Sequence, residues 1–73
     1  MSILTSQDGS GIFRMGSIVG VKMYLDTCLY ASLMNGREYW IGKFSSEKKA
    51  KEVMKCIWYA IDAGISYTVS PEV

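Results

Sequence analysis

Apolar and polar residues alternate along residues 17–25, the pattern of a half-buried β-strand. On this pattern Val19, Val21, Met23 and Leu25 are predicted to share one face of the strand, and the residues between them the other face. A period of two leaves one face for a core and one for solvent, so this strand is predicted to belong to a sheet that is covered on one side.

A β-hairpin is predicted around Asn35-Gly36, which separates two apolar runs at residues 28–34 and 38–44. Asn and Gly both accept a positive φ at low cost, so the dipeptide predicts a type I′ turn. This is the strongest short-range signal in the chain.

Shorter strands are predicted at residues 2–6 and 12–15, joined by a turn in the QDGSG segment, and Asp26-Thr27 is predicted to turn the chain between the two longer strands. A final strand is predicted at residues 65–70 and ends at Pro71, which cannot donate to a sheet ladder.

One amphipathic helix is predicted over residues 46–63. Ser46 is the expected N-cap, because its hydroxyl can accept from the free amides of the first turn. Gly64 is the expected residue at which the helix ends with a positive φ. Spacing the residues at 100° gives one apolar stripe predicted to face the sheet: Ala50, Val53, Met54, Ile57, Ala60, Ile61 and Gly64.

These elements predict an α+β fold in a single domain over residues 1–73. The expected architecture is a small antiparallel β-meander of about five to six short strands, packed by one amphipathic α-helix and followed by a last strand.

Two aromatic residues of the helix fall outside the apolar stripe. Trp58 lies at its edge, where it either packs over the rim of the sheet or anchors an interface, and Tyr59 falls among charged residues. Together with the tyrosines and tryptophan of the strands, they exceed what one thin core can absorb. We therefore expect Trp58 and Tyr59 to form an interface, and the protein to be a homo-oligomer.

Composition excludes several classes of protein. The chain has 73 residues, of which 49% are hydrophobic and 21% charged, with a formal net charge of +1. This balance favours a globular fold over disorder and does not fit a dedicated nucleic-acid binder. No run approaches the ~20 apolar residues that span a bilayer, and the N-terminus lacks a basic segment followed by a long apolar run. We expect a cytoplasmic protein that does not bind membranes.

The sequence does not indicate catalysis. Histidine is absent, and the spacing of Cys28 and Cys56 fits neither a zinc motif nor a CxxC redox pair. A disulfide between these cysteines is conceivable, but two buried reduced thiols are the favoured interpretation. The carboxylates are scattered along the chain. We expect no catalytic residues, no metal site and no cofactor, and therefore not an enzyme.

Binding remains as the expected activity. Arg14 and Arg37 lie beside predicted turns, where a planar guanidinium can bind a phosphate or carboxylate. Lys48 and Lys49 lie at the predicted helix N-terminus, which favours anions, and Trp40 could stack on a base. These five residues are the candidate ligand-binding set. The alternative is that the charges only keep a small apolar protein in solution.

Three segments carry a resemblance: TSQDG near the N-terminus, IGKFSSEKKAKEVMKCI in the middle and YTVSPE at the end. Their order is similar to that in small proteins of phages and prophages from Gram-positive bacteria. CIWYAI departs from the polar second half that the helix usually has in those proteins. The resemblance carries no catalytic residues; it implies stoichiometric binding of a host protein or of an immune signalling nucleotide.

The leading hypothesis is a self-associating, non-enzymatic phage-type protein; its sharper form is a counter-defence protein that sequesters a signalling nucleotide. The second is inhibition of a host enzyme through the Trp58–Tyr59 surface. The third is single-stranded nucleic-acid binding by aromatic residues on the sheet, which the near-neutral charge makes the least favoured.

Overall fold

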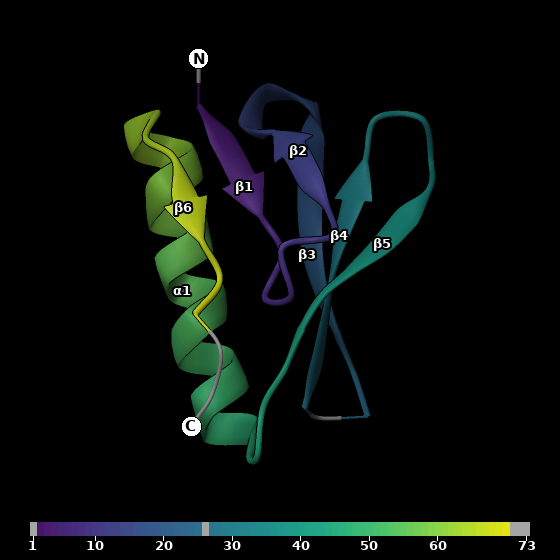
Figure 1. Ribbon diagram of the computed structural model, residues 1–73, viewed down its shortest axis with the longest axis vertical. Coiled ribbons are helices and arrows are strands. Elements are labelled where there is room, and N and C mark those ends of the chain that lie inside the picture. Colours follow the sequence, from purple (N-terminus) through teal and green to yellow (C-terminus); the bar gives the residue numbers. More distant parts are fainter. Residues whose placement is uncertain (1, 26, 71–73) are drawn as a thin grey trace.

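The computed structural model describes residues 2–25 and 27–70, and Figure 1 shows how its elements are arranged. It contains six strands, one helix and one 3₁₀ turn, which confirms the α+β prediction. In chain order they are β1 (Ile3–Thr5), β2 (Ile12–Arg14), η1 (Met15–Ser17), β3 (Ile18–Tyr24), β4 (Cys28–Leu33), β5 (Glu38–Lys43), α1 (Glu47–Ala63) and β6 (Tyr67–Thr68).

The strands form two three-stranded sheets, in the orders β2-β1-β6 and β3-β4-β5. The second sheet is the predicted antiparallel meander. In the first sheet β2 runs antiparallel to β1, but β6 runs parallel to it, pairing Leu4 with Tyr67 and Thr5 with Thr68. Parallel neighbours need a long crossover, and here the rest of the chain, including α1, supplies it.

The helix has the predicted ends and the predicted buried stripe. The Ser46 hydroxyl accepts from the Lys49 amide at 3.2 Å, and Gly64 ends the helix with a φ of 70°. Four residues of the stripe are buried and two are partly buried against the core, whereas Gly64 itself is exposed. The buried residues of the stripe are Ala50, Val53, Ile57 and Ala60.

One core lies between the helix and the two sheets. Leu29, Ala31 and Ile41 of the second sheet and Leu4 of the first are fully buried in it, together with Val69 near the C-terminal end of the described chain. Trp40, Tyr30 and Lys22 occupy the same cross-strand row on the opposite face of the second sheet. That outer face is not covered by the helix.

A β-bulge in β3 makes its first residues face the opposite way from the prediction. The pairing with β4 shifts between Ile18 and Gly20, so Val19 has no direct partner. Val19 is consequently 63% exposed while Ile18 is 7% exposed, the reverse of the predicted alternation. The extra residue changes the phase of the strand, and Val21 is buried as predicted.

The β4–β5 hairpin exists, but its turn is not type I′. The Gly36 amide donates to the Leu33 carbonyl and the Leu33 amide to the Arg37 carbonyl, both at 2.9 Å, which makes a three-residue loop. Gly36 has a φ of 84°, whereas Asn35 does not have a positive φ. This is the type I turn with a glycine bulge that three-residue hairpin loops favour.

The pairing register of β4 and β5 explains why the loop has three residues. A two-residue loop would place Glu38 opposite Leu33, on the side of the core, because a shift by one residue moves every side chain to the other face. The observed loop pairs Glu38 with Ser32 and Tyr39 with Ala31 instead. Glu38 therefore stays on the outer face and Tyr39 points inward. A second bulge, at Ile41, restores the original register near Lys43.

Candidate functional site

A groove of about 470 Å³ lies between the end strands of the two sheets, β2 and β5. No backbone hydrogen bond joins β2 to β5 among the residues that the structure describes, so the two strands border the groove without pairing with each other. Its volume is within the range of small-molecule sites. One side is formed by Ser10, Gly11, Ile12 and Phe13, and the other by Leu33, Tyr39 and Trp40.

The aromatic residues of the groove come from both sheets. The rings of Phe13 and Tyr39 lie 5.4 Å apart between centroids, tilted by 38°. Tyr39 and Trp40 point to opposite faces of β5, but both reach the groove because β5 is an end strand. The groove thus offers aromatic surfaces for stacking and free backbone groups for hydrogen bonds.

The loop before β2 holds one wall of the groove. The Asp8 carboxylate accepts from the hydroxyls of Ser6 and Ser10 at 2.8 and 2.7 Å and from the Ser10 amide at 3.0 Å. The hydrogen bond from the Ser10 hydroxyl is the main cause that lowers the pKa of Asp8. At Gly11, a Cβ would lie 2.8 Å from the Phe13 ring, so only glycine lets that ring lie over the loop.

Arg14 and Arg37 are close in the chain to residues that line the groove, but neither lines it. Arg14 instead lines a separate hollow of about 570 Å³, together with Ser2, Met15, Gly16, Ser17, Ile61 and Gly64. Arg14 follows Phe13, and Arg37 is two residues before Tyr39, the ring that contacts Phe13. The backbone also connects them, because Arg14 precedes the 3₁₀ turn whose Ser17 carbonyl accepts from the amide at the start of the hairpin loop. Within residues 2–25 and 27–70, neither guanidinium has an ion-pair partner. Two arginines beside an aromatic groove suit an anionic, planar ligand.

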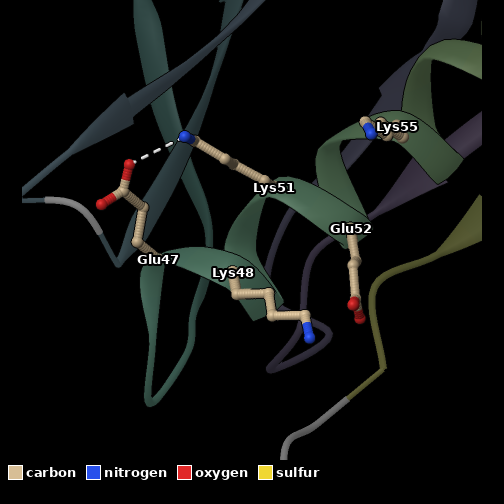
Figure 2. Close-up of a pocket in the computed structure, with 5 residues that line it drawn as sticks. All are labelled: Glu47, Lys48, Lys51, Glu52 and Lys55. Atoms are coloured by element: carbon tan, nitrogen blue, oxygen red, sulfur yellow. Dashed lines mark ion pairs between the residues drawn. The ribbon is translucent and has the colours of Figure 1, made fainter.

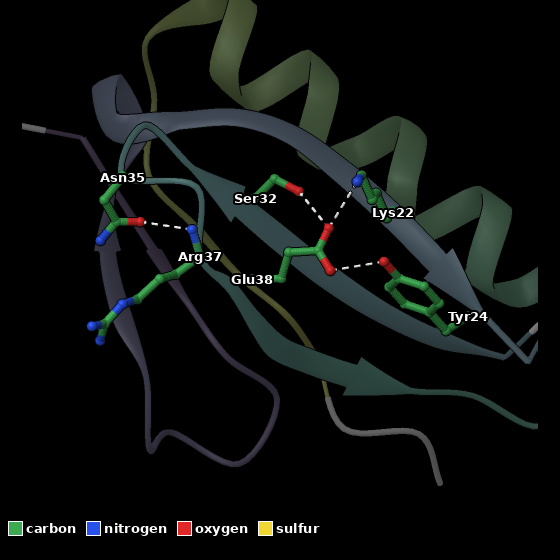
Figure 3. Close-up of polar contacts among 6 residues, drawn as sticks. All are labelled: Lys22, Tyr24, Ser32, Asn35, Arg37 and Glu38. Atoms are coloured by element: carbon green, nitrogen blue, oxygen red, sulfur yellow. Dashed lines mark hydrogen bonds and ion pairs between the residues drawn. The ribbon is translucent and has the colours of Figure 1, made fainter.

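Glu38, the neighbour of Arg37, does not neutralise it. Its carboxylate lies on the outer face of the second sheet, 2.8 Å from Lys22 Nζ, and accepts from the hydroxyls of Tyr24 at 2.7 Å and Ser32 at 3.2 Å. Figure 3 shows the Arg37 side chain extending away from this cluster. The hydrogen bond from Lys22 is the largest cause that lowers the pKa of Glu38.

The cluster of Lys22, Tyr24, Ser32 and Glu38 covers part of the outer face of the second sheet. To reach Glu38 the Tyr24 side chain crosses the sheet, and its ring meets Tyr30 edge-on with centroids 5.1 Å apart. The hydrogen bond to Glu38 also raises the pKa of Tyr24. These two tyrosines contact each other, so they do not form an open stacking platform for a nucleic acid strand.

The structure does not bring Lys48 and Lys49 to this groove. They lie in the first turn of α1, at the opposite end of the molecule from the hairpin loop and the end of β2 (Figure 1). A helix of 17 residues is about 25 Å long, too far for one small ligand to contact both ends. Of the five predicted ligand-binding residues, only Trp40 lines the groove; Arg14 lines a separate hollow, Arg37 precedes the groove strand β5, and the two lysines lie at the other end of the molecule.

A second, shallow hollow follows the helix surface near its N-terminus, lined by Glu47, Lys48, Lys51, Glu52 and Lys55 (Figure 2). Lys51 forms an ion pair with Glu47 at 2.9 Å. Lys48 extends on the other side of the helix from Lys51 (Figure 2). The hollow contains both charge signs and no aromatic residue, so it is a weaker candidate for a nucleotide site.

Trp58 and Tyr59 are exposed, by 42% and 71%, and neither lines the groove. The two cysteines are free, as expected, but they are not buried: Cys28 is partly exposed and Cys56 exposed. Cys56 lies on the flank of α1 where its thiol contacts Tyr67, and burial is the main cause that raises the pKa of that tyrosine.

Six of the seven residues that line the groove were not candidates from the sequence: Ser10, Gly11, Ile12, Phe13, Leu33 and Tyr39. Alternation along residues 38–44 separates Tyr39 from Trp40, but nothing local shows that β5 ends its sheet or that β2 lies beside it. The Gly11–Phe13 spacing is the one local signal, since a glycine two residues from an aromatic ring permits close packing of that ring.

Other classes of site were also considered. The described part of the chain holds no group of three or more His, Cys, Asp or Glu residues placed to bind a metal ion. None of its helices is both long and apolar enough to cross a membrane. Comparison of the chain with models of known protein families found no match, and comparisons with curated proteins and with solved structures found none either.

Proposed function

We propose that this protein binds a small nucleotide in the groove between β2 and β5 and acts by sequestering it, as a phage-type counter-defence protein would sequester an immune signal. The observation that carries the proposal is an aromatic groove whose lining residues Phe13 and Tyr39 are close in the chain to Arg14 and Arg37. Neither arginine has an ion-pair partner among residues 2–25 and 27–70.

Each part of such a ligand has a counterpart in the groove. A base can stack on Trp40 or on the Phe13–Tyr39 pair, and its polar edge can bond to the backbone groups of the two strand edges. The phosphates lie toward Arg14 and Arg37, whose planar guanidinium groups bind phosphate oxygens in pairs. None of the residues that line the groove is a histidine, cysteine or carboxylate, and the proposal is therefore one of binding without conversion of the ligand.

Isothermal titration calorimetry with cyclic nucleotides, linear nucleotides and ADP-ribose derivatives tests the proposal. We expect one of them to bind at one ligand per chain. Arg37→Ala and Trp40→Ala should each weaken binding by about tenfold or more. Lys48→Ala is the matched control, because it removes the same charge at the far end of the helix and should leave binding unchanged. Absence of heat with the whole panel refutes the proposal.

The loop wall gives a further variant. In Gly11→Ala the new methyl group forces the Phe13 ring out of its contact, so binding should weaken although no ligand contact has been removed. A thermal melt separates this effect from loss of the fold.

A second candidate function is favoured by the exposure of Trp58 and Tyr59. In it, these residues bind and inhibit a host enzyme, since Trp and Tyr often dominate binding energy at interfaces. A pull-down from host lysate with the wild type and with Trp58→Ala tests this candidate. Identical sets of captured proteins would count against it.

A further inference from the structure

The outer edge of β3 is the longest unpaired strand edge in residues 2–25 and 27–70. β3 has seven residues and stands at the end of its sheet, with β4 on one side and no strand on the other. The backbone groups of such an edge are a template for another strand. A run of seven residues gives an edge about 23 Å long.

A large apolar side chain is exposed at each end of this edge. Val19 is 63% exposed because the bulge turns it away from the core, and Leu25, directly after the strand, is 88% exposed. They lie at opposite ends of β3. An apolar edge strand without its own cover is a site for association.

Trp58 adds to the same side of the molecule. Around α1 it lies about 100° from the buried Ile57, and Cys56 lies about 100° in the other direction. Cys56 contacts Tyr67 of β6, so its flank faces the first sheet. The Trp58 flank therefore faces away from β6 and the first sheet. The second sheet approaches α1 through β4, the strand that pairs with β3.

We propose that two copies of this chain associate by antiparallel pairing of their β3 strands, with Trp58 of each copy packing beside the joined edge. An edge that pairs with itself antiparallel obeys a two-fold axis, so one surface serves both copies. The Val19 end of one copy then meets the Leu25 end of the other. The two-fold axis repeats this contact, so the dimer contains it twice.

The charges permit this pairing. Lys22 is the charged residue within β3, and its ammonium group is 2.8 Å from the Glu38 carboxylate of the same copy. Pairing Val19 with Leu25 places the Lys22 residues of the two copies opposite each other, and each ammonium group is compensated by the Glu38 carboxylate of its own copy. Since Glu38 also fixes Tyr24, the outer face beside the edge is already ordered before pairing, which reduces the entropy that association costs.

The size of the surface predicts a weak dimer. Val19, Leu25 and Trp58 leave on the order of 350 Å² exposed per copy, and with the strand edge the two copies bury about 1,000 Å² in total. This is the lower end of specific interfaces, so we expect a dissociation constant in the micromolar range.

Sedimentation velocity over concentrations from about 1 μM to about 1 mM tests the proposal. The wild type should change from monomer to dimer, and Trp58→Ala and Val19→Lys should each raise the dissociation constant at least about tenfold. Tyr59→Ala is the control, since it removes a neighbouring aromatic that lies about 100° farther round the helix, on the solvent side, and should leave the dimer intact. Far-UV circular dichroism confirms that each variant is folded.

Hydrogen exchange supplies an independent readout, because pairing should slow the exchange of outward-facing β3 amides only at concentrations where the dimer forms. A wild type that stays monomeric at all concentrations overturns the proposal. A dimer that survives Val19→Lys, or that Tyr59→Ala dissociates, overturns it as well. The groove is not part of this surface, so Trp58→Ala should leave nucleotide binding unchanged, and the two proposals can fail separately.

Discussion

Replacing Gln7 by alanine should destabilise the protein more than its partial exposure suggests. The Gln7 side chain donates to the carbonyls of Lys43 at 3.1 Å and Ser70 at 3.2 Å, and it accepts from the Lys43 amide at 3.0 Å. It thus pairs with Lys43 as a neighbouring strand would. The Gln7 amide also donates to the Ile41 carbonyl at 2.7 Å, so this one residue joins the two sheets at the closed end of the groove.

The magnitude follows from the three side-chain hydrogen bonds. Each contributes about 0.5–1.5 kcal/mol net, and because water can replace part of them, the expected loss for Gln7→Ala is about 2 kcal/mol. For a domain of this size that lowers the midpoint of thermal unfolding by about 8–16 °C. Urea and thermal unfolding followed by circular dichroism measure it.

Gln7→Glu is the informative companion variant. It keeps an acceptor for the Lys43 amide but loses both donations and places a carboxylate beside two carbonyl oxygens. At neutral pH it should be at least as destabilising as Gln7→Ala. A loss below about 0.5 kcal/mol in both variants would refute the reasoning, because the three bonds would then contribute nothing beyond what water restores.

Two further predictions concern titration and backbone conformation. The pKa of Glu38 in the folded protein lies below its ordinary value of 4.5, so Glu38 stabilises the fold above that pH, and this stabilisation is lost as the pH falls through the folded value. Glu38→Gln should therefore remove this part of the destabilisation by acid. Glu52→Gln is the control, because the Glu52 carboxylate is not in such a cluster, and it should leave the acid destabilisation unchanged. Gly64→Ala should lower the free energy of unfolding by about 1 kcal/mol, because the φ of 70° is unfavourable for alanine although a methyl group there would meet no atom within 4 Å. Gly16 is equally open but has no positive φ, so Gly16→Ala should be neutral or stabilising in the same unfolding assay.

Local chemistry allowed the helix to be predicted almost completely. Ser46 and Gly64 act through groups within a few residues of themselves, and the buried stripe follows from the helical period alone. The hairpin at Asn35-Gly36 was predictable for the same reason. Its turn type was not, because Gly36 takes a positive φ in both candidate loops and the choice depends on the face to which Glu38 belongs.

The errors and omissions share a cause, which is contact between segments far apart in the sequence. The bulge at Val19 depends on how β3 matches β4, and the parallel pairing of β6 depends on where α1 returns the chain. The groove needs β2 and β5 to be end strands lying side by side. Of the residues that line the groove, only Trp40 was predicted from the sequence, through its residue type.

The two proposed surfaces lie on opposite edges of the second sheet, and their separation has a consequence for stoichiometry. The groove follows β5 and the pairing edge is β3, with β4 between them. In a dimer joined at β3 the six strands place the two grooves about 24 Å apart, five strand spacings. No single small nucleotide can contact both. Binding should therefore be non-cooperative, at one ligand per chain above and below the dimer dissociation constant; one ligand per two chains would instead require a site on the two-fold axis and would contradict either the groove or the β3 pairing.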